Sequence, residues 1–145
     1  MLCIEIVAVV IGGLLGGGSK DNCVLDWMPM EKSDVLFGQV TWKMGWTTAA
    51  ELAEIGDTLE SKFLRGLILQ DGSENKGVLG DEPPEERKHI RLMVESSRGG
   101  WTGQVVWGFE LIDGERHYAR RLTATKGDRV EMARLVYDYL GPVEV

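Results

Sequence analysis

The feature that most constrains the fold is a succession of four alternating apolar and polar runs between residues 87 and 140. Three short turns join them, at Arg98-Gly99, at Asp113-Gly114 and at Lys126-Gly127-Asp128. An alternation with period two is typical of strands that cover one face, and short turns join antiparallel neighbours. The pattern therefore predicts a four-stranded antiparallel meander whose register follows from its turns.

That register predicts which side chains share a face. The first turn places Leu92 opposite Val105, and the second places Trp107 opposite Arg120. For the third turn we expect a three-residue loop, because this length places Arg120 opposite Arg134 and keeps apolar residues together. The predicted apolar face comprises Ile90, Leu92, Val94, Trp101, Val105, Trp107, Phe109, Leu111, Tyr118, Leu122, Val130, Met132 and Val136, with Arg120 and Arg134 among them. The opposite face would meet solvent through Arg91, Glu95, Thr102, Gln104, Glu110, His117, Arg121 and Glu131.

Upstream of the meander, residues 36–45 predict another strand and residues 48–66 an amphipathic helix. Thr48 and Glu51 have the spacing of a capping box at the start of this helix. Its apolar residues recur at helical spacing and must lie on something apolar; they are Leu52, Ile55, Leu59 and Phe63.

These elements predict an α+β fold in which one long amphipathic helix covers the concave side of a bent antiparallel β-sheet. The arrangement would be cone-like, similar in outline to nuclear-transport-factor-2-like or cystatin-like folds. A calycin-like β-barrel is the alternative, disfavoured by the mid-chain helix. The 145 residues predict a single domain. Its parts would be an N-terminal strand and Gly-rich connector (1–33), a strand and helix (34–70), an acidic loop (71–86) and the meander (87–140).

The apolar N-terminus allows two interpretations. Residues 1–18 could act as a secretion signal or a membrane anchor, but no Lys or Arg precedes the apolar run. The run is also shorter than the about 20 residues that span a membrane. We therefore expect a buried strand over residues 2–11 and a cytoplasmic protein, with secretion or anchoring as the alternative. The glycines at 12–18 predict a flexible connector rather than a phosphate loop, because Ser19 separates Gly18 from Lys20.

Charge and composition exclude several partners and cofactors. A net charge of -7 argues against nucleic acid, which is bound mainly through Lys and Arg. Two cysteines and two histidines without metal-ligand spacing predict no metal site. No cofactor-binding motif is present, so we expect no cofactor. The remaining partners are a small apolar or acidic organic molecule, or a second copy of the chain in a homodimer.

The candidate ligand site lies on the predicted apolar face. Arg120 and Arg134 beside Trp107 and Tyr118 would hold an acidic ligand, because buried guanidinium groups need an anion. Further ligand-binding side chains would be those of Phe109, Trp42 and Trp46. The alternative is that the arginines stack on Trp107 and pair with an acid of the helix, such as Glu51.

A second candidate is catalytic. His117 faces Glu110 in the predicted register, and an oriented His and Glu pair can act as a general base. Both residues fall on the predicted polar face, where a solvated pair is the commoner explanation. Arg120 and Tyr118 are the other candidate catalytic residues, since both can polarise a bound carbonyl or enolate.

The leading hypothesis is thus a pocket protein for an apolar, acidic small molecule. As an enzyme it would be a cofactor-independent isomerase or cyclase. The alternative is a non-catalytic interaction module that dimerises through the outer face of the sheet. An open cavity of more than about 300 Å³ on the apolar face would favour the pocket.

Overall fold

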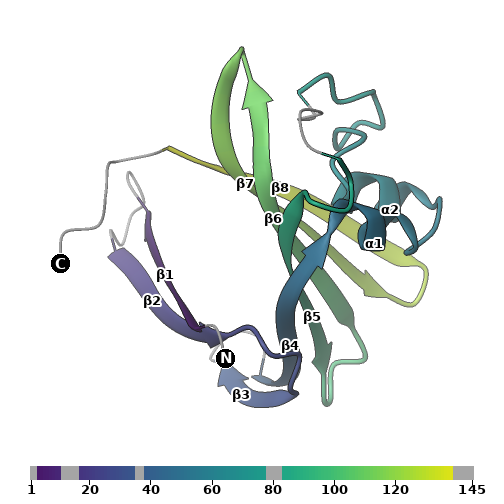
Figure 1. Ribbon diagram of the computed structural model, residues 1–145. Coiled ribbons are helices and arrows are strands. Elements are labelled where there is room, and N and C mark those ends of the chain that lie inside the picture. The colour runs from purple at the N-terminus through teal and green to yellow at the C-terminus, as the bar shows by residue number, and fades with distance from the viewer. Residues whose placement is uncertain (1–2, 11–16, 35–37, 78–82, 139–145) are drawn as a thin grey trace, which may run out of the picture.

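The computed structural model describes residues 3–10, 17–34, 38–77 and 83–138. An antiparallel six-stranded sheet dominates these residues, in the order β3-β4-β5-β6-β7-β8 (Figure 1). Its strands are β3 (Met30–Asp34), β4 (Gly38–Thr48), β5 (Lys88–Ser96), β6 (Thr102–Ile112), β7 (Glu115–Lys126) and β8 (Arg129–Tyr137). β1 (Cys3–Val10) and β2 (Gly17–Val24) form a separate antiparallel hairpin.

The predicted long helix over residues 48–66 is wrong. Two short helices stand there instead, α1 (Ala49–Ala53) and α2 (Leu59–Leu64). Thr48 caps the first as expected, accepting a hydrogen bond from the Glu51 amide. The segment then breaks at Gly56, whose φ is +123°, and Thr58 caps a new helix through the Ser61 amide.

The α+β, cone-like description fails with that helix, because the described fold is mostly antiparallel sheet. The short helices also lie on the side of the sheet that was predicted to face solvent. Leu52 of α1 and Leu64 of α2 pack with Val106, whose side chain points to the opposite face from that of Trp107. We call this face, which carries Val106, Glu110 and Arg121, the helix side.

The other face of the sheet is covered in part by the chain that leaves β2. Leu25 packs there with Met44, Leu92 and Trp107, and the Trp27 amide donates to the Met44 carbonyl at 2.9 Å. Figure 1 shows the β1–β2 hairpin and the helices on opposite sides of the sheet. We call the face that carries Met44, Leu92 and Trp107 the hairpin side.

The four strands of the predicted meander are confirmed, and so is the register of its first two turns. Leu92 pairs with Val105, and Trp107 pairs with Arg120. The three-residue third turn is wrong: Lys126 pairs with Arg129 across a two-residue turn, so Arg120 faces Leu135. A shift of one residue moves every side chain of β8 to the other face, which puts Arg134 on the helix side together with Val130, Met132 and Val136.

β8 is an edge strand with both faces partly open, which explains the error. Leu135 on one face is 45% exposed and Val136 on the other is 44% exposed. The hydrophobic pattern therefore contains little information about which face is covered.

The N-terminal strand expected over residues 2–11 is confirmed over residues 3–10, as β1, and residues 2 and 11 lie outside the described part. The Gly-rich connector is wrong for residues 17–24, which form β2, and residues 11–16 lie outside the described part. No helix in the described residues is long and apolar enough to cross a membrane.

Candidate functional site

An arginine surrounded by aromatic rings stands out on the hairpin side. The Arg120 guanidinium lies 5.1 Å from the Trp107 ring centroid and 5.0 Å from that of Tyr137. The Tyr118 ring lies next to them, 5.6 Å from the Tyr137 ring and 5.5 Å from the Phe109 ring. β6, β7 and β8 bring these residues together because their cross-strand positions coincide. We call Trp107, Phe109, Tyr118, Arg120 and Tyr137 the aromatic–arginine cluster.

The charge of Arg120 has no acidic partner within the described part of the chain. Its Nε is buried and makes no hydrogen bond to those residues. The expected alternative of a pair with a helix acid is not found, because the helices lie across the sheet. Cation–π contacts with Trp107 and Tyr137 stabilise the guanidinium, and its Nε keeps a hydrogen that it can donate to a ligand.

Tyr118 supplies a second donor in the cluster. Burial raises the pKa of its hydroxyl to about 12, although the charge of Arg120 and a hydrogen bond with the Arg120 side chain act in the opposite direction. The hydroxyl therefore stays protonated at neutral pH. It can donate a hydrogen bond to an oxygen placed beside Arg120.

An apolar groove adjoins this cluster. It has a volume of about 470 Å³ and is lined chiefly by Leu92, Val94, Trp101, Val105 and Leu122. The Val105–Leu122 pair is two residues from the Trp107–Arg120 pair along the same strands, a separation of about 7 Å. The groove exceeds the about 300 Å³ that a small-molecule site typically needs.

The predicted ligand-binding aromatic residues share this side of the sheet. Trp42 packs against the core around Leu25 and Met44. Trp46 and Phe109 are more open, at 41% and 51% exposure. The Arg116 guanidinium lies 4.5 Å from the Phe109 ring centroid.

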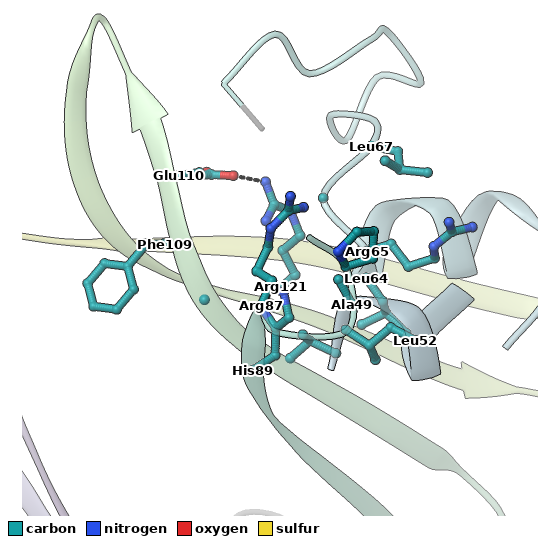
Figure 2. Close-up of a pocket in the computed structure, with 14 residues that line it drawn as sticks. Ala49, Leu52, Leu64, Arg65, Leu67, Arg87, His89, Phe109, Glu110 and Arg121 are labelled. Atoms are coloured by element: carbon teal, nitrogen blue, oxygen red, sulfur yellow. Dashed lines mark hydrogen bonds and ion pairs between the residues drawn. The ribbon is translucent and has the colours of Figure 1, made fainter. Parts of the chain in front are cut away.

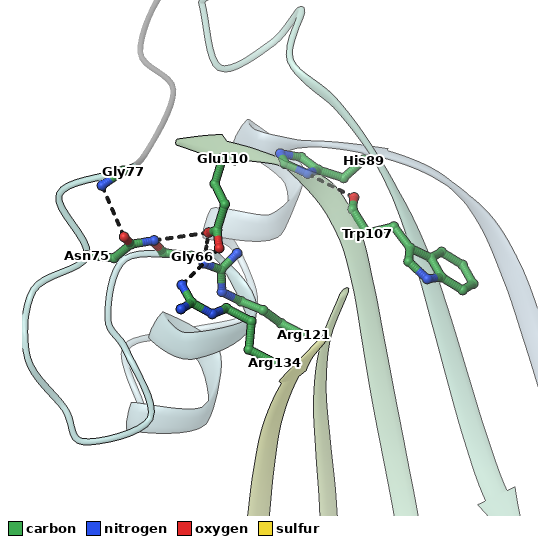
Figure 3. Close-up of polar contacts among 8 residues, drawn as sticks. All are labelled: Gly66, Asn75, Gly77, His89, Trp107, Glu110, Arg121 and Arg134. Carbon is green, nitrogen blue, oxygen red and sulfur yellow. Dashed lines mark hydrogen bonds and ion pairs between the residues drawn. The ribbon is translucent and has the colours of Figure 1, made fainter. Parts of the chain in front are cut away.

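The structure separates Arg134 and Glu110 from this cluster. Glu110 is only 2% exposed on the helix side, where Arg121, Arg134 and Asn75 donate hydrogen bonds to its carboxylate (Figure 3). The last two distances are 2.9 Å from Arg134 Nη1 and 3.1 Å from Asn75 Nδ2. Burial lowers the pKa of the Arg121 guanidinium, and the charge of Glu110 opposes this effect. Sequence reasoning assigned Glu110 and Arg121 to solvent because strand alternation does not reveal which face the helices cover.

His117 pairs with Glu110 across the strands, as the register predicted. The two side chains nevertheless turn to different partners. The His117 Nδ1 lies 3.3 Å from the Tyr137 carbonyl and 3.6 Å from the Asp138 carboxylate, whereas Glu110 binds the two arginines. No contact between described atoms joins the Glu110 carboxylate to the His117 ring.

A smaller cavity of about 150 Å³ lies between the helices and the helix side of the sheet (Figure 2). Ala49, Leu52 and Leu64 form part of its apolar wall. Its polar wall includes His89, Arg87, Arg121 and the Glu110 carboxylate that Arg121 binds. Figure 2 shows the Phe109 ring pointing away from this space. The volume is too small for a drug-sized molecule.

Metal binding finds no support among the side chains that the structure describes, where no three His, Cys, Asp or Glu residues gather.

The described fold and site define an antiparallel β-sheet protein with an open apolar groove beside a half-buried arginine. Two curated proteins are similar to this chain in sequence. One is the pericyclase pydY of Acremonium sp., 32% identical over 125 residues, which are 86% of this chain and 57% of the pericyclase. The other is a probable pericyclase, scpY of Mollisia scopiformis, 28% identical over 124 residues, with 86% and 56% of the two chains covered.

The chain thus spans little more than half the length of these relatives. No family model matches it, and no solved structure matches it.

Proposed function

We propose that this protein is a cofactor-independent cyclase of the pericyclase type. Its substrate would be an apolar small molecule with an acidic or carbonyl oxygen. The observation that carries the proposal is Arg120, a cation held by aromatic rings next to an apolar groove, without a carboxylate partner among the described residues. The similarity to two proteins named as pericyclases supports the choice of reaction class.

The groove would act first by folding the substrate. A pericyclic ring closure moves electrons within one molecule, so its bonds rearrange without an oxidant, a nucleophile or a net proton transfer. The main requirement is that the two reacting ends meet. Holding these two ends at about 3–3.5 Å can lower the activation barrier substantially. The substrate then loses its conformational entropy when it binds, and this cost no longer adds to the barrier of the reaction step.

Arg120 and Tyr118 would polarise the π-system of the substrate. Hydrogen bonds to a carbonyl or enolate oxygen draw electron density from the adjoining π-system, which stabilises charge that develops in the transition state. Loss of one such donor typically lowers kcat by about 10²–10³-fold. This chemistry needs no acid–base pair on the hairpin side, and the buried Glu110 is already bound by three donors.

The proposal is tested in a strain that lacks the gene. We expect the strain to lose a cyclic metabolite and to accumulate an uncyclised isomer of identical mass. Purified protein added to an extract of the strain should restore the cyclic isomer without any added cofactor. A deletion that produces no such pair of isomers would show that the cyclase assignment is wrong.

Arg120→Met tests the role of the cation in the same assay. We expect at least a tenfold lower rate of isomer conversion, with unfolding stability unchanged or higher, because a methionine in this aromatic setting needs no hydrogen-bond partner. Arg98→Met, at an exposed turn, is the matched control and should keep the full rate. Equal rates for both variants would exclude a catalytic role for Arg120.

A further inference from the structure

The cavity on the helix side has polar groups that the proposed cyclase does not use. It lies across the sheet from the aromatic–arginine cluster, because Val106, Gly108 and Glu110 alternate along β6 with Trp107 and Phe109. Its apolar wall comes mainly from α1 and α2, and its polar groups come from β5, β6, β7 and Arg87, which precedes β5 (Figure 2).

His89 offers a hydrogen-bond acceptor to this cavity. Its Nδ1 lies 3.2 Å from the Trp107 carbonyl oxygen, which only accepts hydrogen bonds (Figure 3). The contact therefore assigns the proton to Nδ1 and leaves a lone pair on Nε2. Gly108 makes room for the ring, since a Cβ at that position would lie 2.5 Å from Nδ1.

The environment keeps this histidine neutral. Burial lowers the pKa of His89, and the positive charges of Arg87 and Arg121 lower it further. The hydrogen bond to Trp107 acts in the opposite direction but is the smaller effect. At neutral pH the Nε2 lone pair is thus available to accept a hydrogen bond.

Arg121 offers positive charge to the same cavity. It is 8% exposed, and its Nε finds no acceptor in the described residues. Its acidic partner, Glu110, is shared with Arg134, so one carboxylate faces two guanidinium groups. Glu110 balances the charge of the buried Arg121, and Arg134, whose side chain is 26% exposed, adds a positive charge beside this pair. The unpaired Nε of Arg121 and this additional charge favour an anion.

We propose that this cavity is a second binding site, for a small hydroxy acid. The ligand's carboxylate would lie against Arg121, and its hydroxyl would donate to Nε2 of His89. A volume of about 150 Å³ suits a ligand of a few heavy atoms and excludes a long apolar chain. The proposal is independent of the cyclase assignment, because the two sites lie on opposite sides of the sheet.

The test uses the full chain labelled with ¹⁵N at histidine and titrated with glycolate. The chain has two histidines, so His89→Gln and His117→Gln assign both imidazole spectra. We expect a saturable shift of the His89 Nε2 resonance. Propionate, which replaces the hydroxyl of glycolate with a methyl group, should bind at least fivefold more weakly.

Two variants locate the binding. Calorimetry should detect no saturable glycolate binding to His89→Gln. The same result is expected for Ala49→Phe, whose larger side chain would fill the cavity from its apolar wall. His117→Gln should bind glycolate like the native protein. Circular dichroism verifies that each variant is folded. The proposal is overturned if glycolate produces no saturable shift, if propionate binds equally well, or if Ala49→Phe leaves the affinity unchanged.

Discussion

Glu110 is the single residue on which most buried charge depends. Its carboxylate is 3% exposed at the side chain and neutralises Arg121, while Arg134 also bonds to it from the next strand. Removing one partner of a buried ion pair leaves the other charge without compensation, and this typically lowers stability by about 3–5 kcal/mol.

We therefore expect Glu110→Gln to lower the free energy of unfolding by about 3–5 kcal/mol, measured by urea denaturation. The double variant Glu110→Met, Arg121→Met should recover much of this loss, because an apolar pair needs no ionic partner. Arg134 can turn to solvent in that variant, as its side chain is 26% exposed. A double variant less stable than Glu110→Gln would contradict this account.

His89 makes the stability depend on pH. Its pKa in the folded state is lower than the ordinary value of 6.5, mainly because of burial. As the pH falls below about 6.5 the unfolded chain binds a proton that the folded protein resists, so this residue lowers the free energy of unfolding towards acid. Above that pH His89 is neutral in both the folded and the unfolded protein, so it adds no pH dependence to the free energy of unfolding.

The expected result is a steeper decrease in unfolding free energy between pH 7 and pH 5 for the native protein than for His89→Gln. The difference between the two proteins isolates this residue from the carboxylates, which titrate in both. Urea midpoints measured at half-unit pH intervals give the slopes. Parallel slopes for the two proteins would rule out a neutral buried His89.

At the scale of elements, the helical segment shows how a local break replaces a long helix. Leu59 has helical spacing from Leu52 and Ile55 but is 62% exposed, because the chain turns at Gly56 before it. Thr58 then starts α2, accepting from the Ser61 amide at 3.2 Å and contacting the Ser61 hydroxyl at 2.9 Å.

Thr58→Ala should therefore lower the free energy of unfolding by about 1 kcal/mol, the usual value of an N-cap side chain. Thr58→Ser keeps the hydroxyl and is the matched control. We expect it to lower the free energy of unfolding by at most a few tenths of a kcal/mol. Thermal and urea unfolding both report the difference. If Ala and Ser are equally destabilising, the hydroxyl is not the stabilising group.

Across the whole molecule, the strands of the six-stranded sheet differ in their number of neighbours. We expect local stability to follow this difference between interior and edge strands. β5, β6 and β7 each have a partner along both sides, whereas β3 and β8 lie at the edges. Edge strands leave alternate amide N–H and carbonyl groups without a partner in the sheet. The Gln70 side chain compensates in part by donating to the Met132 carbonyl of β8 at 2.8 Å.

Hydrogen–deuterium exchange should find the slowest amides in β5, β6 and β7. Amides of β8 that do not face β7 should exchange faster by orders of magnitude, because solvent reaches them without unfolding of the sheet. Peptide-level mass spectrometry resolves these strands. Equal protection of β8 and β6 would mean that something covers the β8 edge in solution.

Local sequence patterns were sufficient to predict the features that depend on neighbours along the chain. The four meander strands, the Asp113-Gly114 turn and the cap at Thr48 follow from local patterns, and two registers follow from their turns. Arg120, Trp107 and Tyr118 were predicted together for the same reason, since one short hairpin sets their positions.

Long-range packing, in contrast, fixes which face of the sheet the helices cover and which face Arg134 occupies. A strand face with polar side chains has the same alternating pattern whether it faces solvent or buries an ion pair. The sequence pattern therefore could not predict the buried hydrogen-bond network of Glu110 and Arg121. The half-open edge strand β8 likewise tolerates either register by hydrophobicity alone. Long-range contacts with α2, Asn75 and β6 determine the register of β8 and the face that the helices cover. A local sequence pattern does not reveal these contacts.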